Sequence, residues 1–154
     1  ELVSVSSRNK ESAARLVAEM DLECTVHANL DEVLRDERVQ IVDLTGPNHV
    51  HAEQGIAVAE ADRHLLIEKP MATSVEQADD LIEAAARAGR ALMVGHTFAY
   101  NPAVELLQRL VRDGELGHVY YVNSARLNLG IFQPDINVIW DLAPHDLSIL
   151  LLVL

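Results

Sequence analysis

Residues His64–Val94 read HLLIEKPMATSVEQADDLIEAAARAGRALMV, and this stretch decides the fold class. Two short apolar runs, 64–67 and 91–94, lie at its ends, and neither alternates with polar residues. Continuous apolar runs of this length are typical of strands buried on both faces of a parallel sheet. The segment between them predicts a helix over 73–88, so the stretch predicts a strand–helix–strand unit with a right-handed crossover.

The helix of this unit has signals at both ends. Thr73 and Glu76 have the spacing of a capping box, and Gly89 suits the position that follows a helix. The same alternation of apolar runs and helical periodicity continues toward the N-terminus, which predicts an open, doubly wound α/β sheet. The further expected elements are strands at 2–6 and 39–44, a weaker strand candidate at 24–29, and helices at 10–20 and 49–62.

The pattern changes after Gly95. Asn101 and Pro102 have the order of an N-cap and a first helical residue, and they predict a helix that ends at Gly114. The remaining elements are expected to be an alternating strand over 118–130, a loop from Phe132 and a final helix that begins at Pro144. We therefore expect a dinucleotide-binding domain over 1–98 and the start of an α+β catalytic domain over 99–154.

The composition argues against several classes of partner. The net charge is −12 and no run of basic residues occurs, whereas nucleic acids and anionic membranes both favour basic patches. Cys24 is the only cysteine, which fits a reducing compartment. The longest apolar run, Ile149–Leu154, is too short to span a bilayer. We expect a soluble, cytoplasmic protein.

Three polar clusters follow three predicted strands: SSRN at 6–9, TGPNHVH at 45–51 and EKP at 68–70. Ligands of doubly wound sheets bind outside the carboxyl ends of the strands, so three clusters at one edge predict a dinucleotide crevice. Each cluster alone also fits an ordinary turn or helix start. The residues expected to contact the cofactor are Ser7, Arg8, Thr45, Pro47, Asn48, His51, Glu68, Lys69 and His96.

One expected motif does not occur in the sequence. A dinucleotide fold carries G-x-G-x-x-G after its first strand, and none of the seven glycines has this spacing. Either the interpretation is wrong or the first strand–helix unit precedes Glu1, which would make the domain incomplete. The chain begins on a strand-like segment and ends on its most apolar one, which favours the second alternative.

Three motifs occur in order along the chain. They are EKP at 68–70, followed by a helix rich in small residues, GHTFAYNPAVELL at 95–107, and WDLAPHDLSIL at 140–150, where Asp141 and His145 form a D-x-x-x-H pattern. Together they resemble the Gfo/Idh/MocA family of NAD(P)-dependent sugar oxidoreductases over nearly the whole chain. The resemblance implies a Rossmann domain without its first βα unit and a second domain without its C-terminal sheet.

The resemblance also implies roles for single residues. Glu68 and Lys69 would face the nicotinamide ribose and the substrate hydroxyl, and the peptide bond between Lys69 and Pro70 would be cis. Ser148 stands where the family signature ends in Asp, and Gly46-Pro47 stands where the family has Thr-Pro. Complete members would form dimers or tetramers through the sheet of the second domain.

His145 is a candidate general base for reasons of its own. It follows Pro144 in the predicted first turn of a helix, where the positive end of the helix dipole opposes formation of an imidazolium. Asp141, four residues earlier, could hold the other ring nitrogen; a capping Asp at a polar helix start is the alternative. Lys69 is the second candidate for proton transfer, and the sequence leaves open which of the two acts.

The sequence thus predicts hydride transfer between a sugar or nucleotide-sugar hydroxyl carbon and NADP or NAD. The alternative is a non-catalytic nucleotide-binding or regulatory protein on the same scaffold. Ser6 and Ser7, followed by Arg8, stand where an acid would select NAD, which favours NADP, although Arg8 stacked on adenine would serve NAD equally well. Tyr100 and Arg126 are expected on the substrate side, with an ordinary surface Arg as the alternative. His49 and His51 are two positions apart, but no Cys or carboxylate occurs at zinc-ligand spacing, so no metal is expected.

Overall fold

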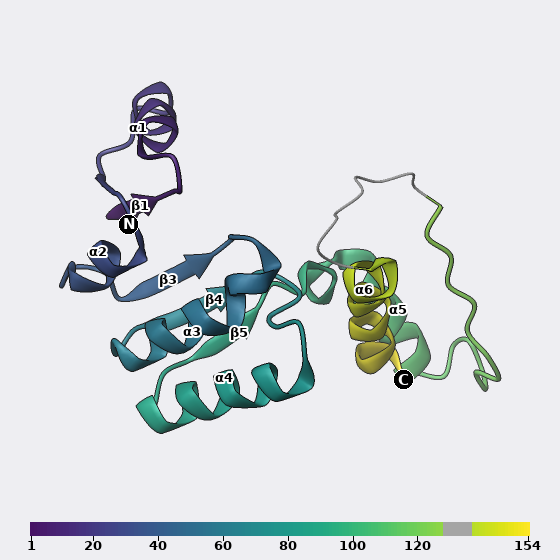
Figure 1. Cartoon of the computed structure of the whole chain (residues 1–154). Helices are drawn as coiled ribbons and strands as arrows, with labels where there is room; N and C mark the ends of the chain where they lie inside the picture. The colour runs from purple at the N-terminus through teal and green to yellow at the C-terminus, as the bar shows by residue number, and fades with distance from the viewer. Residues whose placement is uncertain (128–136) are drawn as a thin grey trace.

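The computed structural model describes residues 1–127 and 137–154, and strands and helices alternate through its first part (Figure 1). The elements are β1 (Ser4–Ser6), α1 (Lys10–Glu19), β2 (Thr25–His27), α2 (Leu30–Arg35), β3 (Ile41–Leu44), α3 (His51–Glu60), β4 (His64–Ile67), α4 (Val75–Ala88), β5 (Leu92–Val94), α5 (Pro102–Arg112) and α6 (Val138–Val153). Short 3₁₀ turns occupy Asn48–Val50 and Thr97–Tyr100. The predicted α/β Rossmann class is confirmed.

All strand pairs are parallel, but the strands form two sheets. β1 pairs with β2, while β3, β4 and β5 form a second sheet in that order. A cavity of about 650 Å³ lies between the sheets, lined by residues of both β1 and β3. Among the described strands, β1 pairs only with β2 and β3 only with β4, so each presents an unpaired edge. A six-stranded doubly wound sheet of order 3-2-1-4-5-6 would have its first strand at this position.

The hydrophobic core lies between the larger sheet and the helices α3 and α4. Val58, Ile67 and Leu81 have essentially no exposed surface, and each comes from a different one of these elements. Gly55 on α3 lets the helices and the sheet approach closely, since a Cβ there would lie 2.9 Å from a methyl of Leu81. The core therefore fixes the carboxyl ends of β3, β4 and β5 relative to one another.

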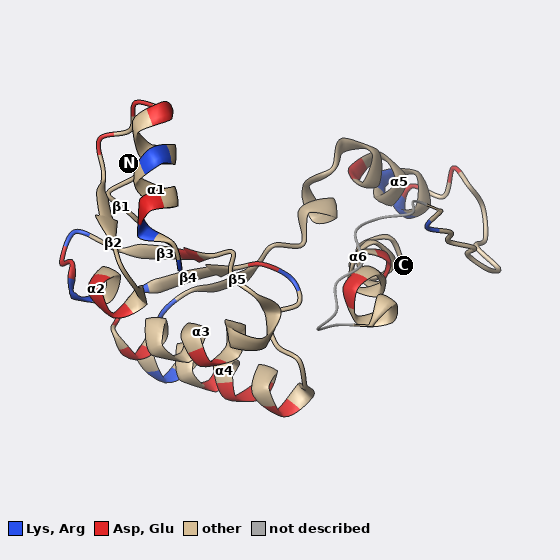
Figure 2. Cartoon of the chain, turned by 45° about the horizontal axis from the view of Figure 1, so that its top comes forward, with Lys and Arg blue, Asp and Glu red and all other residues tan. Residues whose placement is uncertain are grey.

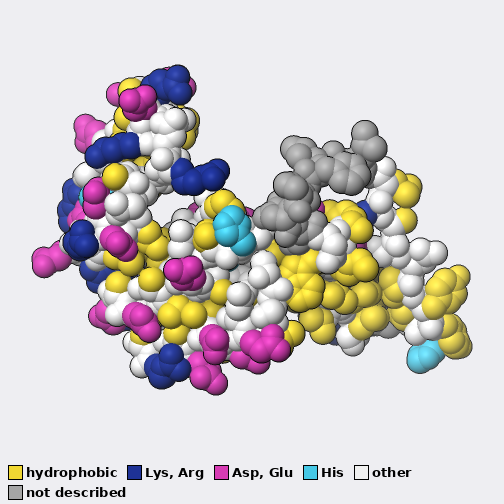
Figure 3. All heavy atoms as spheres, viewed as in Figure 1, with side chains coloured by type: hydrophobic (Ala, Val, Ile, Leu, Met, Phe, Trp, Pro, Cys, Tyr) yellow, Lys and Arg dark blue, Asp and Glu magenta, His cyan; other side chains and the backbone are white. Residues whose placement is uncertain are grey.

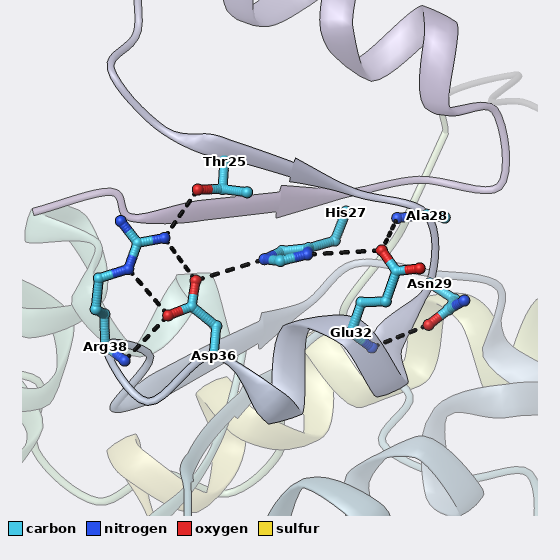
Figure 4. Close-up of polar contacts among 7 residues, drawn as sticks. All are labelled: Thr25, His27, Ala28, Asn29, Glu32, Asp36 and Arg38. Atoms are coloured by element: carbon cyan, nitrogen blue, oxygen red, sulfur yellow. Dashed lines mark hydrogen bonds and ion pairs between the residues drawn. The ribbon is translucent and has the colours of Figure 1, made fainter.

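A polar cluster ties β2 to the end of α2 (Figure 4). The Asp36 carboxylate accepts hydrogen bonds from Arg38 Nε at 2.9 Å and from Arg38 Nη2 at 2.6 Å. The same Arg38 Nη2 donates to Thr25 Oγ1, and His27 lies between the carboxylates of Asp36 and Glu32. These contacts lower the pKa of Asp36 far below its usual range, mainly through the bonds from Arg38. The cluster fastens the edge strand of the smaller sheet.

Two helix starts differ from the prediction. The N-cap of α4 is Ser74 rather than Thr73: Ser74 Oγ accepts from Gln77 N, and Gln77 Oε1 accepts from Thr73 N. Gly89 ends this helix with φ +65°, as predicted. The helix α2 was not predicted, although Asn29 and Glu32 carry its signal: Asn29 Oδ1 accepts from Glu32 N, and Glu32 Oε2 accepts from Ala28 N.

The C-terminal part differs more. Residues 118–127, predicted as part of a strand, form none, and the side chains of Tyr120, Tyr121 and Leu127 are over 80% exposed. No strand lies beside this segment in the described part of the chain, so its backbone groups have no ladder to join. The rest of that predicted strand, 128–130, and the start of the predicted loop lie outside the described residues.

The last helix begins six residues before the position predicted. Asn137 Oδ1 accepts from Trp140 N and caps α6, so Pro144 lies inside the helix rather than at its start. Pro144 has no backbone N–H, so one hydrogen bond of the helix is missing. The first turn of α6 is instead stabilised by contacts with the turn after β4, because Trp140 Nε1 donates to Ala72 O and Lys69 Nζ donates to Asp141 Oδ1. Tertiary contacts thus overcome the helix-breaking tendency of the proline.

The surface is divided by residue type. Acidic residues predominate on α3 and α4, while hydrophobic side chains gather over the α5–α6 end of the molecule (Figures 2 and 3). Of the helices in the described ranges, none combines the length and apolarity that crossing a membrane requires.

Candidate functional site

The centre of the site is Lys69, which lies directly after β4. Its Nζ donates to Asp141 Oδ1 at 2.7 Å and to Asp141 O at 2.9 Å, so one ammonium holds both the side chain and the backbone of the first turn of α6. The side chain of Lys69 is 16% exposed and that of Asp141 is 21% exposed. The peptide bond between Lys69 and Pro70 is cis, as the sequence resemblance implied.

His145 lies about one turn beyond Asp141 on α6. Its pKa is lowered, first by burial and then by the positive charges of Lys69 and Arg126, while Asp141 acts in the opposite direction. The predicted neutral imidazole is therefore supported, but the cause is different, since α6 begins at Val138 and the dipole of a first turn does not act on His145. The predicted contact with Asp141 is also replaced, because that carboxylate bonds Lys69. His145 Nδ1 is buried without a hydrogen-bond partner among the described residues.

Arg126 approaches His145 from the segment that follows α5. Its guanidinium lies 5.1 Å from the ring centroid of Phe98, whose edge in turn meets the His145 ring at 5.1 Å. Arg126 Nε donates to Asp146 Oδ2 at 2.8 Å, and Ser124 Oγ donates to Asp146 Oδ1 at 2.7 Å. These two bonds lower the pKa of Asp146. The sequence placed Arg126 near the substrate, and the structure brings it beside the candidate base.

Glu68 and His96 occupy the same edge of the larger sheet. Glu68 Oε2 accepts from Lys69 N at 3.3 Å, and its carboxylate packs against Gly95, where a Cβ would lie 3.0 Å from Glu68 Oε1. Gly95 therefore gives this carboxylate its room at the end of β5. His96 Nδ1 is buried with no bonding partner in the described part of the chain, and its charged form would contribute to the lowered pKa of His145.

The other predicted cofactor residues gather round the cavity between the sheets. Ser7 and Arg8 line it from the end of β1, and Thr45 and Pro47 line it from the end of β3. Asn48 begins the 3₁₀ turn that follows Pro47. Two strands that are not neighbours in a sheet thus bring their polar ends to one cavity, as expected for a doubly wound fold.

One predicted cofactor residue, His51, has a position that does not match the expectation. His51 has no exposed surface and bonds backbone carbonyls through both ring nitrogens, so its side chain does not reach the cavity. Tyr100 is 65% exposed at the end of the 3₁₀ turn Thr97–Tyr100. Ser148, which replaces the signature Asp, donates its hydroxyl to His145 O at 2.8 Å and so still contacts the site.

Four residues of the site were missed by the sequence reasoning, namely Gly95, Phe98, Trp140 and Asp146. Gly95 had a detectable signal, as a glycine directly after a strand in the GHTFAYNPAVELL motif. Trp140 and Asp146 flank the two signature residues but act through partners far along the chain, which no local pattern shows. Within residues 1–127 and 137–154, no three His, Cys, Asp or Glu side chains gather as a metal site would require.

Comparisons with known proteins agree with this geometry. A family model described as "Oxidoreductase family, NAD-binding Rossmann fold" (GFO_IDH_MocA) matches residues 1–96. The UDP-N-acetylglucosamine 3-dehydrogenase of Acidithiobacillus ferrooxidans is 34% identical over 156 residues, which cover 99% of this chain and 47% of that protein.

Solved structures show the same fold. The apo form of a levoglucosan dehydrogenase matches with a TM-score of 0.82 at 26% identity, over 99% of this chain and 43% of its own. The WlbA dehydrogenase from Bordetella pertussis, solved in complex with NADH and UDP-GlcNAcA, matches with a TM-score of 0.69 at 31% identity, over 78% of this chain and 34% of its own. The chain thus spans less than half the length of each of these relatives. With its polar strand ends, its parallel sheets and a family match over residues 1–96, the chain belongs to the Gfo/Idh/MocA family of NAD-binding, Rossmann-fold oxidoreductases.

Proposed function

We propose that the complete protein transfers a hydride between the hydroxyl-bearing carbon of a sugar or nucleotide sugar and NAD(P). The observation that supports this most strongly is the Lys69–Asp141 ion pair beside a His145 whose pKa is lowered. A fixed ammonium and a neutral imidazole suit the oxidation of an alcohol: one can polarise the oxygen and the other can take the proton.

The ion pair favours one assignment of the two candidate bases. Lys69 Nζ already donates to Asp141 Oδ1 and to Asp141 O, so we assign it as a hydrogen-bond donor to the substrate oxygen rather than as the base. His145 is then the base, since burial and the neighbouring positive charges keep its imidazole neutral and able to accept the hydroxyl proton. A bound nicotinamide would supply the hydride chemistry.

The residues present fit such a cofactor at the carboxyl ends of the strands. Ser7 and Arg8 offer a hydroxyl and a guanidinium on one side of the cavity, and Thr45 offers a hydroxyl on the other. These groups suit a ribose and its phosphate, and Arg8 can pair with a 2′-phosphate or stack on an adenine. The buried Nδ1 atoms of His96 and His145 lack partners among the described residues, as expected beside a ligand site.

The cavity is longer than this polar end. It continues along β1 and β3 to Glu1 and Val39, between two unpaired strand edges. We propose that a further parallel strand of the complete protein pairs with both edges and joins the two sheets, which would also bring a glycine-rich turn to the polar end. On this proposal residues 1–98 belong to the dinucleotide-binding domain, and residues 99–154 begin the substrate domain.

The substrate class rests on two further observations. The WlbA dehydrogenase was solved with UDP-GlcNAcA, and another relative is named a UDP-N-acetylglucosamine 3-dehydrogenase. In this chain Arg126 lies beside the candidate base, where a guanidinium could meet a phosphate or carboxylate of a nucleotide sugar. A non-catalytic nucleotide-binding protein would have no need of the Lys69–Asp141–His145 arrangement.

Assays of the complete protein with NAD and NADP against free sugars and UDP-sugars test the proposal. We expect the complete protein to oxidise at least one of these sugars. This activity should be lost in Lys69→Met and retained in the surface variant Arg112→Gln. If both cofactors bind and no sugar is oxidised or reduced, the regulatory alternative holds instead.

A further inference from the structure

His51, the first residue of α3, is the one polar residue fully buried in the described part of the chain. Its Nδ1 lies 2.8 Å from Pro70 O, and its Nε2 lies 2.8 Å from Gly46 O. Pro70 follows Lys69 directly, and Gly46 lies between Thr45 and Pro47 in the loop after β3. One imidazole ring therefore joins the turn that carries Lys69 to the loop that lines the cavity.

Both partners of the ring are carbonyl oxygens, which accept hydrogen bonds and never donate them. Pro70 is buried, so loss of its contact with His51 would leave a backbone carbonyl there without this partner, which folded proteins rarely tolerate. The ring is thus a specific two-ended link rather than an apolar filler.

The turn that contains Lys69 and Pro70 also makes hydrogen bonds with α6. Trp140 Nε1 donates to Ala72 O at 3.1 Å, two residues beyond Pro70, and Asp141 bonds Lys69. The backbone of the turn is therefore held at two points, at Pro70 O by an imidazole and at Ala72 O by an indole, and Lys69 directly precedes the first of them.

We propose that His51 is a positioning residue with two separable tasks: its Nδ1 sets the place of Lys69 through Pro70, and its Nε2 sets the cofactor-facing loop through Gly46. The catalytic part of this inference rests on the proposed function, because it assumes that Lys69 acts on a substrate. The structural part does not.

Asparagine and glutamine separate the two tasks. The amide nitrogen of Asn falls near the position of a histidine Nδ1, and that of Gln falls near Nε2. His51→Asn can therefore keep the bond to Pro70 and lose the bond to Gly46, whereas His51→Gln can do the reverse. His51→Leu loses both, and His118→Gln, at an exposed histidine far along the chain, is the matched control.

The first measurement needs no activity. Trp140 is the only tryptophan, so its indole N–H gives a single NMR signal that reports the position of Ala72 O. His51→Gln and His51→Leu are expected to shift this signal, His51→Asn to shift it least, and His118→Gln to leave it in place. An unmoved indole signal in both the Gln and the Leu variants, with the dispersion of the backbone amide spectrum retained, overturns the proposal.

The second measurement is made on the complete enzyme. His51→Gln is expected to lower kcat by about tenfold or more with little change in the cofactor KM, because Lys69 is displaced. His51→Asn is expected to raise the cofactor KM with little change in kcat. If His51→Gln and His51→Asn lower kcat and raise the cofactor KM to the same extent, His51 only stabilises the fold.

If none of the variants folds, the wild-type chain still tests the proposal. A ring N–H signal of His51 is expected to be protected from exchange with water, because the side chain is fully buried and its nitrogens face carbonyl oxygens. Ring protons of His51 that exchange freely with water contradict it. A complete protein without activity, together with a shifted indole signal in His51→Gln, would reject the proposed function but not the link.

Discussion

Lys69 Nζ lies 2.7 Å from Asp141 Oδ1, although 72 positions separate the two residues. The pair joins the end of β4 to the first turn of α6 and so connects the sheet to the C-terminal helices. Because the same nitrogen also donates to Asp141 O, the ammonium is held at two points. This relationship places the proposed hydrogen-bond donor next to the proposed base.

The proposed roles of Lys69 and His145 can be tested by replacing one side chain at a time. Lys69→Ala and His145→Ala are each expected to lower kcat of the complete enzyme by about 10²-fold or more, the usual scale for a group that assists proton transfer. Cofactor affinity should suffer more in Lys69→Ala than in His145→Ala. Asp141→Asn, which keeps the backbone contact, is expected to lie between these variants and the wild type. Near-normal turnover of both alanine variants would contradict the assignment.

The pH profile tests which residue is the base. The pKa of His145 is lowered, so its neutral form persists to a lower pH than that of an ordinary histidine, and kcat/KM should fall only as the pH drops through that lowered pKa. Arg126→Gln removes one of the positive charges that lower it, so the acidic limb of the profile should move to higher pH. Arg112→Gln, on the exposed end of α5, is the control and should leave the limb in place. A limb that does not respond to Arg126→Gln would point away from His145.

Cofactor choice depends on the turn after β1. The two hydroxyls of Ser6 and Ser7 and the guanidinium of Arg8 can bind a 2′-phosphate, and no acid lies between Ser6 and Glu11 to repel it. NADP is therefore expected to be used at least as well as NAD, and Arg8→Ala should reduce kcat/KM for NADP more than for NAD. Arg15→Ala, on the exposed face of α1, serves as the comparison. A strong NAD preference that Arg8→Ala leaves unchanged would reverse this prediction.

The stability of the smaller sheet should depend on the charge of Asp36. The bonds from Arg38 lower the pKa of Asp36 from its ordinary value of 3.8, so the folded chain stabilises the ionised carboxylate more than the unfolded chain does. This stabilisation is complete above the ordinary pKa and is lost as the pH falls through the lowered one. Asp36→Asn should lower the urea midpoint at pH 7, and its difference from the wild type should narrow below about pH 4.

Glu37→Gln is the matched control for this experiment, since Glu37 is an exposed carboxylate next to Asp36. It should leave the urea midpoint nearly unchanged at both pH values. An Asp36→Asn variant as stable as the wild type at pH 7 would show that the cluster of Figure 4 contributes nothing to stability.

Local patterns determined much of this fold. The four short apolar runs became β1, β3, β4 and β5, and the weaker candidate at 24–29 became β2, because short apolar runs between helices have few other ways to be buried. Gly89 and Pro102 marked a helix end and a helix start for backbone reasons that require no tertiary contact. The EKP turn and the D-x-x-x-H signature identified Lys69, Asp141 and His145 from their order alone.

Long-range contacts decided the rest. The helix α6 starts at Val138 because Trp140 and Asp141 bond Ala72 and Lys69, partners that no local pattern around Pro144 reveals. The predicted strand at 118–127 does not form, because alternation makes a strand only where another strand offers its edge. His51 looked like a cofactor ligand in the sequence, and only the packing of α3 under the Pro70 turn shows that both of its nitrogens are used internally. Sequence periodicity specifies which segments become helices and strands, but the partner of a buried polar group depends on residues dozens of positions away, which only the folded chain brings within hydrogen-bond distance.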